Sequence, residues 1–158
     1  MEHAPKAVQA LRSALEAVDE LDLLSTTADL DRFSRDAYDY SPVLEEQFGP
    51  CRAQLVVRPH TVAAVMAVAS ACAQASVPLT LRGAGTGNYG QCVPLQGGVV
   101  MLMGELRAVR ALDPMTGVVE VECGCLLKEL DRELASQGRQ LRLMPSTWPP
   151  SCPAGFTK

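Results

Sequence analysis

RGAGTGNYG, residues 82–90, holds four glycines in nine residues and directly follows the apolar run VPLTL of residues 77–81. Glycine has no Cβ, so such a run can adopt positive φ angles and bring several backbone N–H groups close to one anion. The stretch therefore predicts a phosphate-binding loop at the end of a strand. Arg82 has two open interpretations: a contact to phosphate, or an ion pair that holds the loop in place.

Three of these glycines, Gly85, Gly87 and Gly90, also fit the dinucleotide fingerprint GxGxxG of a NAD-binding Rossmann module. That fold requires a helix directly after the glycines. The chain continues instead as QCVPLQGG over residues 91–98, where a proline and a glycine pair interrupt a helix. We therefore expect the loop to lead into a strand at residues 99–103 that is buried on both faces. The Rossmann alternative predicts a helix over residues 88–98.

Helices and strands alternate in the rest of the chain, which indicates α+β or α/β layering. Hydrophobic spacing predicts helices over residues 5–20 and from the N-cap Thr61 to Ala75, and a third after Leu126 that Gly138 caps. Strands are predicted at residues 55–57, 78–81 and 140–143, and a hairpin at 108–112 and 118–123. The predicted buried face of the second helix consists of Val62, Val65, Met66, Ala69 and Cys72. In the hairpin, Val119, Val121 and Cys123 alternate with Glu120 and Glu122, so one face is expected to be wet.

Composition indicates one globular domain: 158 residues, 47% hydrophobic and 20% charged. The net charge is −4 without a basic cluster, which argues against a nucleic-acid partner or an anionic membrane surface. No apolar run approaches the ~20 residues of a membrane span, so we expect no integral membrane segment. The N-terminus does not resemble a secretory signal, and a cytoplasmic location is therefore expected.

Six cysteines occur in the chain, and without an export signal we expect free thiols. Cys123 and Cys125 lack the CxxC spacing of metal or redox pairs, so we expect ordinary packing and no metal site. His3 and His60 are expected at the surface.

Taken in order, VVRP, the helix that begins at Thr61, the segment VPLTLRGAGTGNYGQCVPLQGGVVML, the DP turn, VVEVECGCLLKEL and PST resemble one known family. This is the FAD-binding domain of the vanillyl-alcohol oxidase and p-cresol methylhydroxylase (PCMH) flavoproteins, which include flavin-dependent lactate and glycolate dehydrogenases. The resemblance covers residues 30–148. It implies an α+β fold, as the N-terminal α/β subdomain of an incomplete PCMH-type domain.

The resemblance also implies a ligand, FAD, and the residues that bind it. It places Pro59 beside the adenine. Residues 83–90 contain no histidine for a covalent link, so non-covalent FAD is expected. By the same resemblance, the pyrophosphate would be wrapped by Arg82, Gly83, Ala84, Gly85, Thr86, Gly87 and Asn88. The flavin side would be approached by Pro145, Ser146 and Thr147.

Three segments are expected: a helical extension (residues 1–28), the N-terminal part of the FAD-binding domain (29–148) and a divergent proline-rich tail (149–158). Family members continue into a substrate-binding cap, so we expect a cofactor-binding portion of an oxidoreductase of 2-hydroxy acids or similar alcohols, with little turnover alone. No catalytic base can be named, because Tyr38, Asp39, Tyr40 and Tyr89 are interpreted as surface or packing residues. The alternatives are a non-catalytic or partner-dependent subunit, with a separate chain that supplies the missing half, and the Rossmann module.

Overall fold

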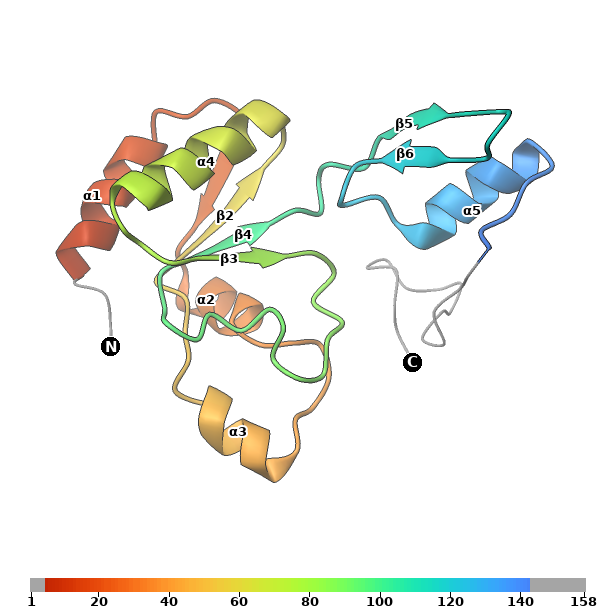
Figure 1. The fold of residues 1–158 in the computed structure, drawn as a ribbon. Coiled ribbons are helices and arrows are strands. Elements are labelled where there is room, and N and C mark those ends of the chain that lie inside the picture. Colours follow the sequence, from red (N-terminus) through yellow and green to blue (C-terminus); the bar gives the residue numbers. More distant parts are fainter. Residues whose placement is uncertain (1–4, 143–158) are drawn as a thin grey trace.

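A four-stranded sheet, in the order β1-β2-β4-β3, lies at the centre of the fold (Figure 1). The computed structural model describes residues 5–142. Strand β1 runs antiparallel to β2, while β2, β4 and β3 are parallel. The strands of this sheet are β1 (Leu21–Leu24), β2 (Leu55–Pro59), β3 (Leu79–Arg82) and β4 (Val99–Leu102). The other elements are α1 (Pro5–Leu15), α2 (Thr27–Phe33), α3 (Pro42–Phe48), α4 (Val62–Gln74), β5 (Val109–Leu112), β6 (Val119–Val121) and α5 (Leu127–Ser136).

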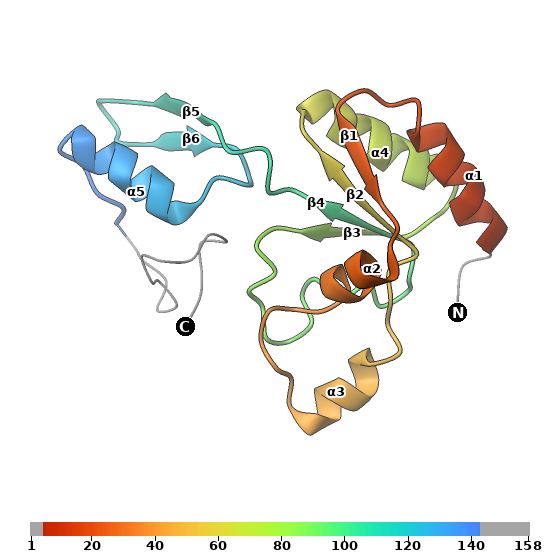
Figure 2. The ribbon, with the colours of Figure 1, turned by 180° about the vertical axis from the view of Figure 1, so that it is seen from behind.

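Helices cover both faces of the central sheet, α1 and α4 on one side and α2 on the other (Figures 1 and 2). Alternate residues of the central strands divide between two hydrophobic clusters, because successive side chains of a strand point to opposite faces. Leu55, Val57 and Met101 join α1 and α4 in one cluster. Val56 and Val100 join residues of α2 in the other. All four residues of β4 are buried, which confirms the prediction of a strand buried on both faces.

The connection from β3 to β4 contains no helix over residues 88–98. Parallel strands need a long crossover, and here an irregular glycine-rich loop takes the place of the usual helix. The loop was predicted from its proline and glycine pair, and this prediction is confirmed. The Rossmann alternative, which required a helix in this segment, is wrong.

The N-terminal part of the chain differs from the prediction. The first helix ends at Leu15 rather than at residue 20, and residues 21–24 form β1, which pairs with β2. Helices α2 and α3 were not predicted either. Both are single short helices with a hydroxyl N-cap, Thr26 for α2 and Ser41 for α3, and too few residues to show a hydrophobic period.

Helix α4 begins at the predicted N-cap Thr61, whose hydroxyl accepts a hydrogen bond from the Ala64 N–H. Its predicted buried face was right at Cys72, which is buried, and at Val65, which packs against the core, and wrong at the other three positions. Nearly every residue of α4 is apolar, so the sequence pattern could not single out one face, and packing against the sheet decided it. Val62 and Met66 are 50% and 67% exposed, and Ala69 is exposed. Val65 is half-buried, and the buried residues are Ala64, Val68 and Cys72.

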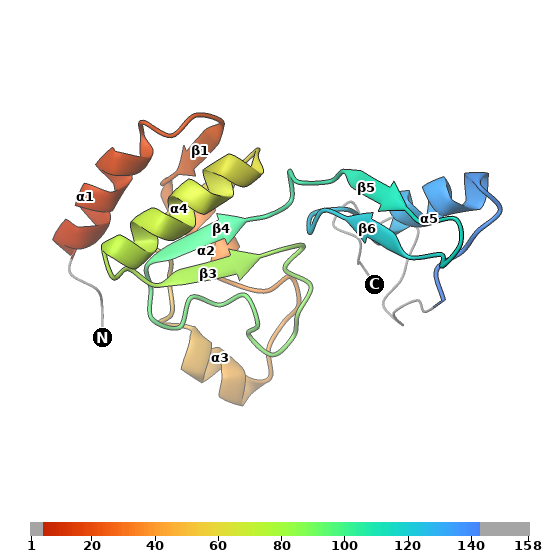
Figure 3. The same ribbon diagram turned by 45° about the horizontal axis from the view of Figure 1, so that its top comes forward.

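Residues 105–142, here called the hairpin lobe, extend beyond the end of β4, away from residues 5–104, the sheet lobe (Figure 3). The hairpin β5–β6 and the helix α5 with Gly138 after it (φ +69°) match the predictions. The hairpin face that was expected to be buried differs from the prediction, because Val121 is 37% exposed and Cys123 is exposed. The described part of the predicted strand at 140–143, residues 140–142, is not a strand.

Candidate cofactor site

A cavity of about 610 Å³ lies between the two lobes, at the carboxyl ends of β3 and β4. Ligands of open sheets with parallel strands commonly bind at this end, and 300–1,000 Å³ is the usual range for a small-molecule pocket. The lining residues come from four places: the end of α2 and the segment after it, the start of the glycine loop, the segment after β4, and the segment before α5. They are Arg32, Phe33, Asp36, Ala37, Arg82, Gly83, Ala84, Gly104, Arg107 and residues 123–127.

Positive charge predominates in this lining. Arg32 and Arg107 are exposed, and Arg82 is buried, with 7% of its surface exposed. Asp36 is the acidic member of the lining. Three arginines against one aspartate suit an anionic ligand, because guanidinium groups bind phosphate oxygens well.

Arg82 is the last residue of β3, and its side chain runs beneath the glycine loop. Its Nη1 donates a hydrogen bond to the backbone oxygen of Arg35 at 2.6 Å, and its guanidinium lies 5.8 Å from the centre of the Phe33 ring. Burial lowers the pKa of Arg82, and the negative charge of Asp36 opposes this shift. An arginine remains protonated under such conditions. In residues 5–142, no carboxylate forms an ion pair with Arg82, so the predicted ion pair that would hold the loop is absent there.

The glycine loop has an outer side that faces the cavity and an inner side that packs on Arg82. A Cβ added at Gly83 would meet no heavy atom within 4 Å, and Gly83 lines the cavity. Gly85 has φ +68°, and a Cβ there would lie 2.1 Å from Nη2 of Arg82. Gly83 therefore leaves space for a ligand, whereas Gly85 leaves space for the arginine beneath the loop.

Of the residues predicted to bind FAD, the cavity lining contains Arg82, Gly83 and Ala84. Four more follow them along the loop and do not contribute to the lining: Gly85, Thr86, Gly87 and Asn88. Pro59 is fully buried at the end of β2, also outside the lining. Pro145, Ser146 and Thr147 lie outside the described residues.

Sequence reasoning missed the segments on the other walls of the cavity. Asp36 and Ala37 belong to a connection for which no motif was recognised. Cys123 and Cys125 were expected to be packed, but Cys123 is exposed and Cys125 half-buried at the cavity wall. The signal was present in the glycine between them: a Cβ on Gly124 would lie 2.2 Å from the backbone oxygen of Met103, which marks a close approach to the end of β4.

Within residues 5–142, no group of three or more acidic, histidine or cysteine residues could hold a metal ion. The five cysteines of this part of the chain are free thiols. His60 is 40% exposed at its side chain and lies 3.0 Å from Asp22 Oδ2. In the same part of the chain, no helix has the length and apolar character needed to cross a membrane.

The family described as FAD binding domain matches residues 53–158. A Schizosaccharomyces pombe protein named as a mitochondrial D-lactate dehydrogenase is 28% identical over 121 residues, which cover 77% of this chain and 22% of that protein. The glycolate oxidase subunit GlcD of Escherichia coli K12 is 34% identical over 73 residues, 46% of this chain and 15% of the relative. The chain thus spans about a fifth of the length of such curated relatives.

Solved structures of flavoenzymes share the fold. The structure of p-cresol methylhydroxylase with substrate bound superposes with a TM-score of 0.69 at 20% identity, covering 95% of this chain and 27% of that one. At this identity the likeness shows the fold, which is the predicted PCMH-type α+β architecture. The family match covers more than half of the chain and includes the glycine loop. The chain therefore belongs to the FAD-binding domain family and is related to the flavin-dependent lactate and glycolate oxidoreductases.

Proposed function

We propose that this chain binds FAD non-covalently in the cavity between its two lobes and forms the cofactor-binding portion of an oxidoreductase of 2-hydroxy acids. The observation that carries the proposal is a cavity at the carboxyl ends of two parallel strands, with a glycine loop and three arginines in its wall. The relatives named as D-lactate dehydrogenase and glycolate oxidase subunit support the substrate class.

The residues present fit a dinucleotide with a diphosphate. The space left open at Gly83 allows the backbone to approach the diphosphate, with Ala84 beside it. Arg32 and Arg107 at the cavity wall would offset its charge, and Arg82 would act from beneath the loop. When bound, the isoalloxazine of FAD accepts electrons from a substrate. The chain's own residues would hold the cofactor and orient it.

The remaining predicted contacts belong to the same proposal. Gly85, Thr86, Gly87 and Asn88 would continue the diphosphate-binding loop, and Pro59 would lie on the adenine side. Pro145, Ser146 and Thr147 would approach the flavin. Non-covalent attachment is proposed because residues 83–90 contain no histidine.

A calorimetric titration of the purified chain with FAD tests the proposal, with Gly83→Val as the deciding variant. A Cβ at position 83 would meet no heavy atom within 4 Å and Gly83 lines the cavity, so the fold should persist while the valine blocks the backbone and FAD affinity falls roughly tenfold or more. Ala63→Val on the exposed side of α4 is the control, and it should bind FAD like the wild type. Equal affinity of Gly83→Val and wild type would contradict the proposed site.

A second candidate is a partner-dependent subunit. Exposed apolar side chains of the hairpin lobe favour it: Met115, Val118 and Val121 are 92%, 65% and 37% exposed. Co-expression with the neighbouring reading frame, followed by size-exclusion chromatography, would give a stoichiometric complex under this hypothesis. Separate elution of the two chains would contradict it.

A cytoplasmic location remains part of the proposal. One relative is described as mitochondrial, so an organelle is the competing location. Fractionation of the producing cells, with immunodetection of the chain, should find it in the cytoplasmic fraction. Recovery with an organelle or membrane fraction would contradict this location.

A further inference from the structure

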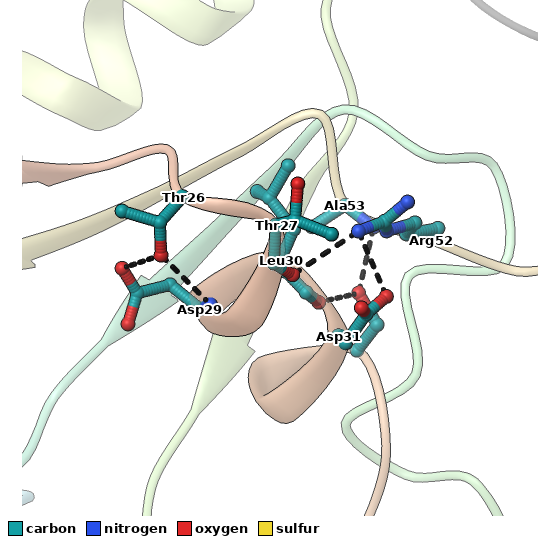
Figure 4. A network of polar contacts seen from close by, with 8 residues as sticks. Thr26, Thr27, Asp29, Leu30, Asp31, Arg52 and Ala53 are labelled. Atoms are coloured by element: carbon teal, nitrogen blue, oxygen red, sulfur yellow. Dashed lines mark hydrogen bonds and ion pairs between the residues drawn. The ribbon is translucent and has the colours of Figure 1, made fainter.

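Asp36 and its neighbours connect a firmly held helix to the glycine loop. Figure 4 shows how α2 is attached to the segment before β2: Arg52 pairs with Asp31 at 2.8 Å and donates to the backbone oxygen of Thr27 at 3.1 Å. At the end of α2, the Ser34 hydroxyl accepts from the Ala53 N–H at 2.8 Å and donates to the Leu30 oxygen at 2.6 Å. The chain that leaves α2 therefore starts from a fixed position.

Residues 35–37, which follow Ser34, contact the glycine loop at both of its ends. Near the start of the loop, Arg35 accepts the hydrogen bond from Arg82, and the Ala37 N–H donates to the Gly85 oxygen at 2.7 Å. At the far end, Asp36 Oδ2 accepts a hydrogen bond from the Gly90 N–H at 2.9 Å. The Asp36 side chain thus holds the far end of the loop, while the backbone of Arg35 and Ala37 holds the near end.

Helix α3 supports the same arrangement from the other side. The Asp36 N–H donates to the Tyr40 hydroxyl at 2.7 Å, and the Tyr40 ring packs edge-on against Phe48 with 5.2 Å between ring centres. Phe48 also limits the far end of the loop, because a Cβ on Gly90 (φ +81°) would lie 2.4 Å from its ring. Position 90 therefore requires glycine, and its N–H is directed at the carboxylate.

Burial of the Asp36 carboxylate is unfavourable, and its contact with the glycine loop compensates for this. Only 9% of Asp36 is exposed, and its Oδ1 has no hydrogen-bond partner among residues 5–142. A buried carboxylate is unfavourable unless hydrogen bonds and neighbouring positive charge compensate it. The Gly90 N–H and the buried Arg82 guanidinium provide this compensation at the loop itself.

We infer that Asp36 is a positioning residue for the cofactor: its hydrogen bond to Gly90 holds the glycine loop in the conformation that receives a diphosphate. This inference rests on the proposed FAD site. Asp36 does not need to touch the ligand, because it acts through the loop. The loop backbone is held at Gly85 by the Ala37 N–H and at Gly90 by the Asp36 carboxylate.

Calorimetric titration of the full chain with FAD and with ADP tests the inference in three variants. Asp36→Ala removes the acceptor, and affinity for both ligands should fall by roughly tenfold, the usual effect of losing a hydrogen bond to a charged group. Asp36→Asn keeps an acceptor for the Gly90 N–H and should restore affinity to within about threefold of wild type. Asp39→Ala, an exposed acid three residues further on, is the matched control and should bind like the wild type.

Hydrogen exchange of the ligand-free chain provides a readout that does not depend on FAD. The Gly90 amide should exchange slowly in the wild type and in Asp36→Asn, and roughly tenfold faster in Asp36→Ala. If Asp36→Ala does not fold, Tyr40→Phe replaces it, since this variant keeps the ring contact with Phe48 but removes the hydroxyl that fixes the Asp36 backbone. It should accelerate Gly90 exchange.

Several results would overturn the inference: unchanged Gly90 exchange and FAD affinity in Asp36→Ala, unchanged Gly90 exchange in Tyr40→Phe, or an Asp36→Asn variant as weak as Asp36→Ala. Absence of FAD binding by the folded wild type would instead contradict the proposed function. In that case the exchange experiment still decides whether Asp36 holds the loop.

Discussion

The strands of the sheet lobe and of the hairpin lobe both contain valines, but the two lobes bury these valines to different extents. In the sheet lobe, β2 and β4 are covered on both faces, and Val56, Val57, Val99 and Val100 have no exposed surface. In the hairpin lobe, Val121 is 37% exposed. A valine in a strand is therefore buried only where another element packs against that strand.

The two walls of the cavity, the glycine loop and residues 123–127, are therefore held in place to different extents by the rest of the chain. The glycine loop is held by hydrogen bonds to the segment after α2. The segment at residues 123–127 belongs to the lobe with fewer buried side chains. We expect the sheet-lobe wall to be the rigid one and the hairpin-lobe wall to adjust.

The largest expected effect comes from the sheet lobe. Leu55→Ala deletes a side chain that is 1% exposed in β2, and it should lower the free energy of unfolding by about 2–5 kcal/mol, as cavity-forming substitutions do. Urea unfolding followed by circular dichroism measures this change. Val118→Ala, at a position 65% exposed in the hairpin lobe, is the control and should change it by less than about 0.5 kcal/mol. Equal changes in the free energy of unfolding for the two variants would contradict the expected difference in burial between the lobes.

An intermediate effect is expected in α5. Leu134 is 4% exposed, and Leu134→Ala should cost about 2 kcal/mol, with the loss confined mainly to the hairpin lobe. Hydrogen exchange should show faster exchange in β5, β6 and α5 while β2 and β4 stay protected. Loss of protection in β4 would mean that the two lobes unfold as one unit.

The smallest effect concerns thiol reactivity and leaves stability unchanged. Burial raises the pKa of Cys72 in the sheet lobe to about 11, so its thiol is protonated at pH 8 and should react slowly with iodoacetamide. Cys123 in the hairpin lobe is exposed and should react first. Mass spectrometry of the labelled peptides orders the two sites. Labelling of Cys72 at the rate of Cys123 would show that the sheet lobe opens readily.

Prediction from sequence succeeded where local chemistry is decisive. Thr61 caps α4 because its hydroxyl accepts from the Ala64 N–H, and Gly138 ends the last helical turn because it tolerates a positive φ. The segment after the glycine loop is not helical because it contains a proline and a glycine pair. Each of these depends on residues only a few positions apart.

Prediction failed where the environment is decisive. Met66 was assigned to the buried face of α4 and is 67% exposed, because a helix of almost entirely apolar residues has no preferred face until it meets the sheet. Strand β1 was missed because its pairing with β2 is a long-range contact. Asp36 was missed for the same reason: its hydrogen bond to Gly90 spans 54 positions.

The sequence by itself determined the glycine loop, the strands on either side of it and the family to which they belong, since backbone freedom at glycine and restriction at proline are properties of single residues. Only the tertiary structure decided which side of that loop faces the cavity. It placed Arg82 beneath Gly85 and left Gly83 open, and it brought Asp36 to Gly90. These contacts arise from the packing of α2 on the sheet and of Tyr40 on Phe48 of α3, which no local pattern specifies.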